Sequence, residues 1–274
     1  MRQIESITEI HQLLAKCLNH FATFCNANNL RFYLSNGTLL GAVKYKGFIP
    51  WDDDVDVMMP RSDYDQLMEL SEIDRDGYRL LARERIPNWS MPYAKLSVES
   101  TLLQETSADF GVPCGISIDI FPLDNWPGYY PAAVLQAFYL SLLRRGLSAS
   151  VERTFFTQRT GITRTILLLI WKFSRAMGTP FFLSLIDKQV ERGRKREQSP
   201  YVGCIAWAAY GTGEILPSNI FDKTVKLSFG GVEYPAPAGC DVYLRRHYGN
   251  YKMDPPISKQ KSNHTITLWD KSDE

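Results

Sequence analysis

The sequence has few cysteines and no long apolar run. These absences argue against a disulfide-rich, a zinc-binding and a membrane-spanning protein. The five cysteines are widely spaced and form no C-x-x-C pair, so neither a disulfide framework nor a zinc site is supported. The N-terminal residues contain no apolar segment of the signal-peptide type, and no uninterrupted apolar run approaches the ~20 residues that span a bilayer. We therefore expect a cytoplasmic protein.

The chain also has almost no net charge. The formal value is +1, which gives no indication of a nucleic-acid partner, and we expect none. The distribution is uneven, however, because residues 144–196 contain 12 Lys or Arg against three Asp or Glu. With 274 residues and 45% hydrophobic residues, the chain can bury a large core. We expect a core domain at residues 1–125, a helical basic insertion at 126–200, and a C-terminal segment at 201–274 that completes the core domain.

Hydrophobic spacing predicts an α/β protein. Apolar residues at helical spacing predict a first helix over residues 4–24, and shorter helices are expected at 39–43 and at 63–70, the latter capped by Ser62. A turn is expected at 36–38, and the last ten residues look loosely held. Strands are predicted at residues 31–35, 54–57, 78–81, 93–97, 101–105 and 116–121.

Four carboxylates crowd into the apolar run around Asp54. In a strand, Asp52, Asp54 and Asp56 would share one face while Asp53 would take the other. Residues two apart on one face lie about 6–7 Å apart, and like charges at that distance repel by roughly 3 kcal/mol per pair. The cluster therefore predicts a divalent cation, and with it metal-assisted phosphoryl transfer.

Asp119 is the natural third ligand of such a cation. It lies in the predicted strand 116–121, where a strand interior otherwise disfavours Asp. Oxygen-only ligands favour Mg²⁺, with Mn²⁺ as a possible substitute. An EF-hand would need Gly and Glu where the chain has Val57 and Asp63, so that alternative fails. A solvated acidic turn without an ion is the other alternative, and the apolar residues 55 and 57–59 argue against it.

Gly37 and Thr38 follow a predicted strand and could cradle a phosphate through backbone N–H groups and a hydroxyl. Alone, a Gly-Thr pair usually marks an ordinary turn. Together with Asp54-x-Asp56 and a later strand acid, it is typical of the nucleotidyltransferase fold. We therefore expect a mixed sheet with flanking helices and a helical insertion.

The sequence resembles the LicD family, bacterial phosphocholine transferases related to fukutin and fukutin-related protein. The continuous segment 34–64 carries the resemblance most strongly. Further matching positions are Lys95-Leu96, residues 118–124, Tyr243-Leu244, residues 248–251, Pro255-Pro256 and His264. The similarity covers about residues 1–125 and 200–265.

The resemblance implies transfer of a phospho-alcohol from a CDP-alcohol donor to a sugar hydroxyl, with release of CMP. The acceptor would be a surface polysaccharide, a teichoic acid or a lipid-linked glycan precursor, and the alcohol would be choline first, with glycerol and ribitol open. The implied metal ligands are Asp54, Asp56 and Asp119, supported by Asp52. Gly37 and Thr38 become the phosphate-binding turn, and His264 a phosphate or nucleotide contact. The cysteine cluster that binds zinc in the animal relatives is not reproduced.

Basic side chains near these motifs are candidate contacts to the donor phosphates: Lys44, Lys46, Arg61 and Lys95. Asp119 or Asp52 could act as the general base for the acceptor hydroxyl, and the sequence does not choose between them. Two other functions stay open. One is transfer of the nucleotide itself to a small acceptor, and the other is a non-catalytic scaffold in glycan assembly.

One segment of the insertion has an amphipathic pattern. Apolar residues 162, 166, 169, 170 and 173 share a helix face, while Arg164, Lys172 and Arg175 lie elsewhere on the helix. The pattern predicts peripheral contact between residues 144–196 and the anionic inner face of the plasma membrane. A helix packed in the core of the insertion, with its basic residues in solvent, is the alternative.

Overall fold

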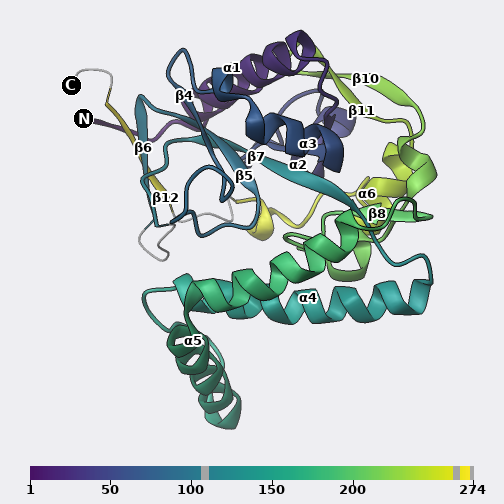
Figure 1. Cartoon of the computed structure of the whole chain (residues 1–274). Helices are drawn as coiled ribbons and strands as arrows, with labels where there is room; N and C mark the ends of the chain where they lie inside the picture. Colours follow the sequence, from purple (N-terminus) through teal and green to yellow (C-terminus); the bar gives the residue numbers. More distant parts are fainter. Residues whose placement is uncertain (106–110, 262–265, 272–274) are drawn as a thin grey trace.

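A computed structural model describes residues 1–105, 111–261 and 266–271 of the chain (Figure 1). Its centre is a mixed β-sheet with helices on its faces, which confirms the predicted α/β class. The strand order is β2-β3-β7-β5-β4, and β8 and β9 extend the sheet from the far end of β7. These strands are β2 (Tyr33–Leu34), β3 (Asp56–Pro60), β4 (Tyr78–Leu81), β5 (Ala94–Val98), β7 (Ser117–Asn125), β8 (Tyr201–Gly203) and β9 (Leu216–Pro217).

Strands β3 and β7 run parallel at the centre, and the other pairings in this sheet are antiparallel. Both central strands are apolar on alternate positions, with Val57, Met59, Ile118 and Ile120 fully buried. Helix α1 (Ile7–Ala27) packs on β5 and β7 through an apolar stripe that includes Leu14, Leu18 and Phe21. This packing fixes the sheet that carries the acidic residues.

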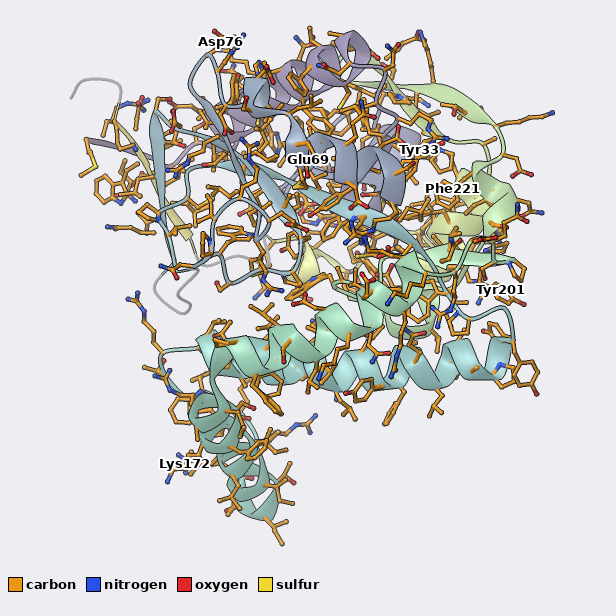
Figure 2. The ribbon with its side chains drawn as sticks, in the orientation of Figure 1. Tyr33, Glu69, Asp76, Lys172, Tyr201 and Phe221 are labelled. Carbon is orange, nitrogen blue, oxygen red and sulfur yellow. The ribbon has the colours of Figure 1, made fainter. Side chains whose placement is uncertain are left out.

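Several short elements frame one edge of the sheet. Helices α2 (Asn36–Lys44), α3 (Arg61–Glu69) and α6 (Cys240–Tyr248) pack near β2 and β3, and the hairpin β10 (Thr224–Phe229) and β11 (Val232–Pro237) closes over α2. Tyr33 of β2 contacts Phe221 at 5.4 Å between ring centroids, and both are labelled in Figure 2. The 3₁₀ turns are Ser71–Ile73, Gly211–Glu214, Ser218–Phe221 and Ile257–Lys259.

The structure corrects the predicted boundaries of four elements. The expected turn at residues 36–38 is the first turn of α2, because Leu39 N–H already donates to Ser35 O. Strand β3 begins at Asp56 instead of 54 and ends at Pro60, while β7 continues to Asn125. Helix α3 begins at Arg61, so Ser62 lies inside it and caps nothing.

The C-terminal residues form more structure than expected. Strand β12 (Ile266–Asp270) pairs with β1 (Arg2–Ile4) on one side and with β6 (Thr101–Glu105) on the other. Leu268 is buried in the main core, so the strand is held by packing as well as by the backbone ladder. The expectation of a loosely held end was therefore wrong for these residues.

Two long helices, α4 (Tyr130–Val151) and α5 (Gly161–Arg194), lie together on the side of the molecule opposite α1 (Figure 1). By length and composition alone, α5 is apolar enough to cross a membrane, and only 17% of its most apolar window is buried. The prediction from uninterrupted apolar runs missed this helix because Arg164, Lys172 and Arg175 break up its apolar residues.

Candidate active site

A row of three charged side chains crosses the central sheet. Asp56 on β3 is the register partner of Asp119 on β7, and Asp119 is in turn the register partner of Lys95 on β5. Register partners project from the same face of a sheet, so the three side chains lie next to one another. Lys95 donates a hydrogen bond to the Asp119 carboxylate and forms an ion pair with it. The structure thus brings together two of the predicted acids and one predicted cation.

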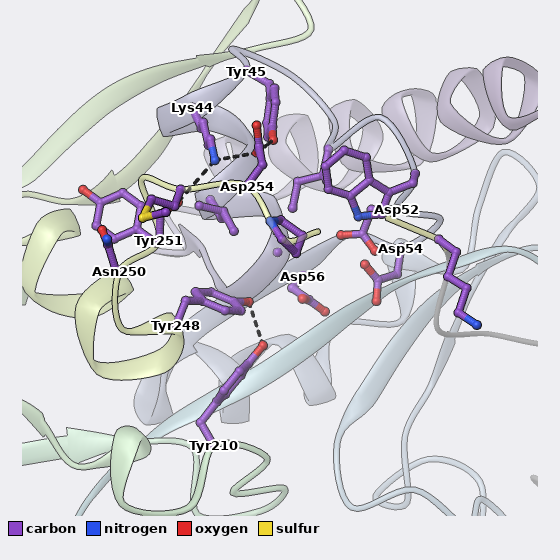
Figure 3. A pocket seen from close by; sticks show the side chains of 17 residues that line it. Lys44, Tyr45, Asp52, Asp54, Asp56, Tyr210, Tyr248, Asn250, Tyr251 and Asp254 are labelled. Atoms are coloured by element: carbon purple, nitrogen blue, oxygen red, sulfur yellow. Dashed lines mark hydrogen bonds and ion pairs between the residues drawn. The ribbon is translucent and has the colours of Figure 1, made fainter. Parts of the chain in front are cut away.

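The loop before β3 adds two more acids. Asp52, Asp54 and Asp56 line one cavity, although only Asp56 lies in the strand and the other two lie in the loop before it (Figure 3). Gly37 makes this approach possible. A Cβ at Gly37 would lie 2.8 Å from Asp52 Oδ2 and 3.9 Å from Asp54 Oδ1, and the first distance is too short for a real contact.

The carboxylates of this cluster repel one another. Burial, followed by the charges of Asp54 and Asp53, raises the pKa of Asp52 to about 7. Burial and the neighbouring Asp54, Asp119 and Asp52 raise the pKa of Asp56 well above its ordinary value. For Lys95, burial opposes the charge, but Asp119, Cys114 and Asp54 together outweigh that effect and the pKa is raised. The cluster therefore favours binding of further positive charge.

A divalent cation would supply that charge. The donor set consists of carboxylate oxygens, which suits Mg²⁺ or Mn²⁺. Within the described part of the chain, no three Asp, Glu, His or Cys side chains are already gathered closely enough to hold a metal ion. Mg²⁺ nevertheless commonly uses only one or two carboxylates together with water and substrate phosphates. Asp54 and Asp56 suit that arrangement, with Asp119 nearby but engaged by Lys95.

The N-terminus of α2 faces the same cavity through Gly37. Helix N-termini attract anions because their first backbone N–H groups lack partners within the helix. Thr38, by contrast, is buried, and its Oγ1 accepts a hydrogen bond of 2.8 Å from the Asp56 N–H. The hydroxyl predicted to contact phosphate therefore holds the start of β3 in place.

The predicted basic contacts separate into two groups. Lys44 lines the cavity, where its ammonium pairs with Asp254 at 2.6 Å, and Lys95 lies beside the acids. Lys46 is exposed on a loop and Arg61 is the partly buried first residue of α3, and neither lines this cavity. Arg61 instead donates to both oxygens of the buried Asp124, at 2.7 and 2.8 Å. His264 lies outside the described residues.

Sequence reasoning missed most of the cavity wall. The cavity has a volume of about 590 Å³, within the usual range for small-molecule sites. Aromatic side chains contribute much of its lining: Tyr45, Trp51, Tyr210, Tyr248 and Tyr251. Asn250, Met253, Asp254, Pro255 and Lys261 complete the C-terminal side. Residues 248–251 and 255–256, which resemble the LicD family, could have indicated part of this wall. Tyr210 belongs to no motif recognised in the sequence.

Two buried polar residues, His247 and Glu214, contact Tyr210 on the side away from the cavity, and Tyr210 in turn contacts Tyr248. The two tyrosine hydroxyl oxygens are 2.6 Å apart, as the dashed line in Figure 3 shows. The ring of His247 stacks on Tyr210, and Glu214 accepts the Tyr210 N–H. Burial raises the pKa of Glu214 to about 7 and lowers that of His247 to about 3. Near neutral pH, His247 is therefore uncharged.

Comparison with known proteins agrees with this geometry. A family model described as "LicD/FKTN/FKRP, nucleotidyltransferase domain" matches residues 29–132, which include the four acids, Lys95 and α2. The lipopolysaccharide cholinephosphotransferase LicD of Haemophilus influenzae is 26% identical over 259 residues, which is 90% of this chain and 93% of that protein.

Shorter similarities occur in two uncharacterised proteins of Rickettsia. The protein from Rickettsia prowazekii is 35% identical over 71 residues, 26% of this chain and 23% of its own length. The one from Rickettsia typhi is 34% identical over 73 residues, 26% of this chain and 20% of its own length. The Haemophilus similarity, in contrast, extends over nearly the whole of both chains, and the family model covers the acidic side of the site. Both comparisons indicate that the chain is related to the LicD family.

Proposed function

We propose that this protein transfers phosphocholine from CDP-choline to a sugar hydroxyl of a glycan and that it uses Mg²⁺. The observation that carries the proposal is the cavity in which Asp52, Asp54 and Asp56 face aromatic side chains. The nearly full-length similarity to a lipopolysaccharide cholinephosphotransferase supports the same reaction class.

The charge of the cavity favours choline over glycerol or ribitol. Four carboxylates line it, those of Asp52, Asp54, Asp56 and Asp254, against the two ammonium groups of Lys44 and Lys261. Choline alone among the three alcohols carries a positive charge. Its quaternary ammonium has no N–H to donate and binds well against aromatic faces. Trp51 and Tyr45, whose ring centroids lie 6.3 Å apart, are the strongest candidates for that contact.

The same negative charge would repel the donor diphosphate. When bound, Mg²⁺ would neutralise the diphosphate oxygens and hold them for in-line attack. The chain contributes Asp54 and Asp56 as ligands and the N-terminus of α2 as an anion contact. Lys95 keeps the Asp119 carboxylate in place beside Asp56.

The reaction forms one bond and breaks one. The acceptor hydroxyl oxygen attacks the phosphorus distal to cytidine, and the bond from that phosphorus to the bridging oxygen breaks. CMP leaves with the bonding electron pair, and the hydroxyl proton passes to a carboxylate. Asp52 lines the cavity, whereas Asp119 accepts a hydrogen bond from Lys95 and does not line it. Asp52 is therefore the better-placed general base.

The test is release of CMP from CDP-choline, CDP-glycerol and CDP-ribitol with Mg²⁺ and a crude glycan acceptor. We expect acceptor-dependent CMP from CDP-choline and loss of that release in the presence of EDTA. A nucleotidylated acceptor without free CMP would instead identify the protein as a nucleotidyltransferase. If every nucleotide binds but none reacts with any acceptor, the scaffold function is favoured.

A further inference from the structure

The first half of α5 stands apart from the rest of the molecule. Residues 161–177, here called the arm, project beyond the end of α4 (Figure 1), and Figure 2 places Lys172 on this projection. Large apolar side chains on the arm are exposed, with 79% of Ile162, 60% of Leu169 and 58% of Phe173 accessible to solvent. Exposed apolar surface of this extent in one place usually marks an interaction site.

The backbone conformation at Gly178 explains why the arm does not pack against α4. Gly178 has φ +73° and ψ 164°, a non-helical conformation that turns the chain in the middle of α5. After the turn, Phe182, Leu183 and Ile186 pack on α4, where Gly146 leaves room for the Phe182 ring. Residues 161–177, which precede the turn, extend beyond the end of α4 (Figure 1). The arm therefore presents its apolar side chains to solvent.

The arm separates apolar and basic side chains. Ile162, Ile166, Leu169, Ile170 and Phe173 recur at helical spacing and form one exposed stripe. Basic residues lie on other faces of the arm or in the loop before it, and no Asp or Glu occurs between residues 153 and 186. The basic residues of this stretch are Arg153, Arg159, Arg164, Lys172 and Arg175.

Helix α4, which lies beside α5 (Figure 1), carries a second exposed apolar stripe. Leu135, Phe138, Tyr139 and Leu142 are spaced three and four residues apart, and 71% of Leu135 and 63% of Phe138 are accessible. The opposite side of α4 is buried, with Ala133, Ala137 and Leu140 in the core. The two stripes thus belong to neighbouring elements and have no partner among the described residues.

We propose that the arm and the α4 stripe dock the protein on an anionic lipid membrane, with the arm lying in the interface. A net positive charge beside an apolar stripe complements anionic headgroups above acyl chains. Spanning does not fit, because 17 residues of helix extend only about 25 Å against a hydrocarbon core of about 30 Å. Lys172 also lies within the arm, where a spanning helix would carry its charge into the hydrocarbon core. This inference is independent of the reaction at the acidic cavity.

Flotation of the purified protein with vesicles tests the proposal. Vesicles of phosphatidylcholine mixed with phosphatidylglycerol are compared with vesicles of phosphatidylcholine alone, at low ionic strength. We expect the protein to float with the anionic vesicles and much less with the neutral ones. The double variant Arg164→Gln/Lys172→Gln should bind about 25-fold more weakly, at roughly fivefold per basic residue. Leu169→Gln/Phe173→Gln should weaken binding by at least about tenfold.

A matched control uses exposed valines on the remote β10–β11 hairpin, where Val225→Gln/Val232→Gln should leave flotation unchanged. All of these positions are exposed, so the variants should fold, and circular dichroism checks that they do. Absence of the protein from the floated anionic vesicles would overturn the proposal, as would unchanged binding of both arm variants. A dimer in light scattering that Leu169→Gln/Phe173→Gln dissociates would assign the arm to a second copy of the chain instead.

Discussion

Asp56 and Asp119 are register partners on the adjacent parallel strands β3 and β7, and Lys95 is the only cation paired with either of them among the described residues. Two acids and one cation leave the row negative, and Asp52 and Asp54 beside it increase the excess. Such an excess destabilises the metal-free protein and favours a bound cation. The acidic residues therefore favour cation binding but lower the stability of the metal-free protein.

Asp56→Asn tests that relationship. The substitution removes a proposed ligand and one of the repelling charges, so turnover should fall by at least about a thousandfold. The metal-free protein should become more stable by about 1–2 kcal/mol. Urea unfolding with and without Mg²⁺ measures this, and the stabilisation by Mg²⁺ should disappear in the variant. The exposed Asp222→Asn serves as the control. Retained turnover in Asp56→Asn would refute the assignment.

Gly37→Ala tests the close approach of α2 to Asp52. The new Cβ would lie 2.8 Å from Asp52 Oδ2, so the carboxylate must move. We expect turnover to fall by about 10- to 100-fold, because displacement of a group in the site by about 1 Å has effects of that size. Gly128→Ala is the matched control, since its Cβ would meet only Pro200 Cδ at 3.5 Å. Equal activity of the two variants would mean that Asp52 need not stay in place.

Trp51→Leu tests the choline contact. An aromatic face contributes about 0.5–2 kcal/mol to binding of a cation, so KM for CDP-choline should rise between about twofold and 30-fold. KM for CDP-glycerol should change little, because glycerol carries no positive charge. Trp269→Leu on the remote strand β12 provides the control. A parallel rise of KM for both donors would place the cytidine, rather than the choline, against Trp51.

The sequence drew attention to the acids of the candidate site but not to its walls. Asp52, Asp54 and Asp56 stand close together in the chain, and all three line one cavity although only Asp56 lies in a strand. Their pairing with Asp119 required only that two apolar strands be neighbours. The aromatic wall comes from residues 45–51, 210 and 248–255, which lie far apart in the chain. Only tertiary packing brings these segments together, so the spacing of residues along the sequence does not predict this wall.

The basic residues Lys95 and Arg61 also show that the sequence alone does not assign the role of a side chain. Both stand near acidic motifs, and the sequence gives them equal standing as phosphate contacts. The acidic partner distinguishes them, because Arg61 pairs with the fully buried Asp124 while Lys95 pairs with Asp119 in the site. Which acid a cation meets depends on the register of β5, β7 and α3. That register is a property of the folded sheet.

Arg61→Gln tests the structural assignment of that residue. Removing one partner of a buried pair leaves Asp124 uncompensated, so unfolding free energy should fall by about 3–5 kcal/mol. The more exposed pair Arg83–Asp187 provides the control, and Arg83→Gln should cost less than about 1 kcal/mol. Urea denaturation measures both. A large rise in KM for the donor without loss of stability would restore Arg61 as a phosphate contact.

Glu214 makes stability depend on pH. Burial raises its pKa from 4.5 to about 7, so the folded protein binds a proton that the unfolded chain releases between these values. The stability associated with protonated Glu214 is fully present below about pH 4.5 and is lost as the pH rises through about 7. A shift of this size corresponds to about 3 kcal/mol.

Glu214→Gln isolates this effect, because glutamine resembles the protonated acid and can still accept the Tyr210 N–H. Relative to the variant, the wild-type protein should lose about 2–3 kcal/mol of unfolding free energy between pH 4.5 and pH 8. Comparison with the variant cancels the opposite contribution of His247, whose pKa is lowered to about 3. Urea unfolding at several pH values measures the difference. A constant difference across this range would show that Glu214 keeps the same ionisation state, and hence that its buried charge is compensated from within the fold.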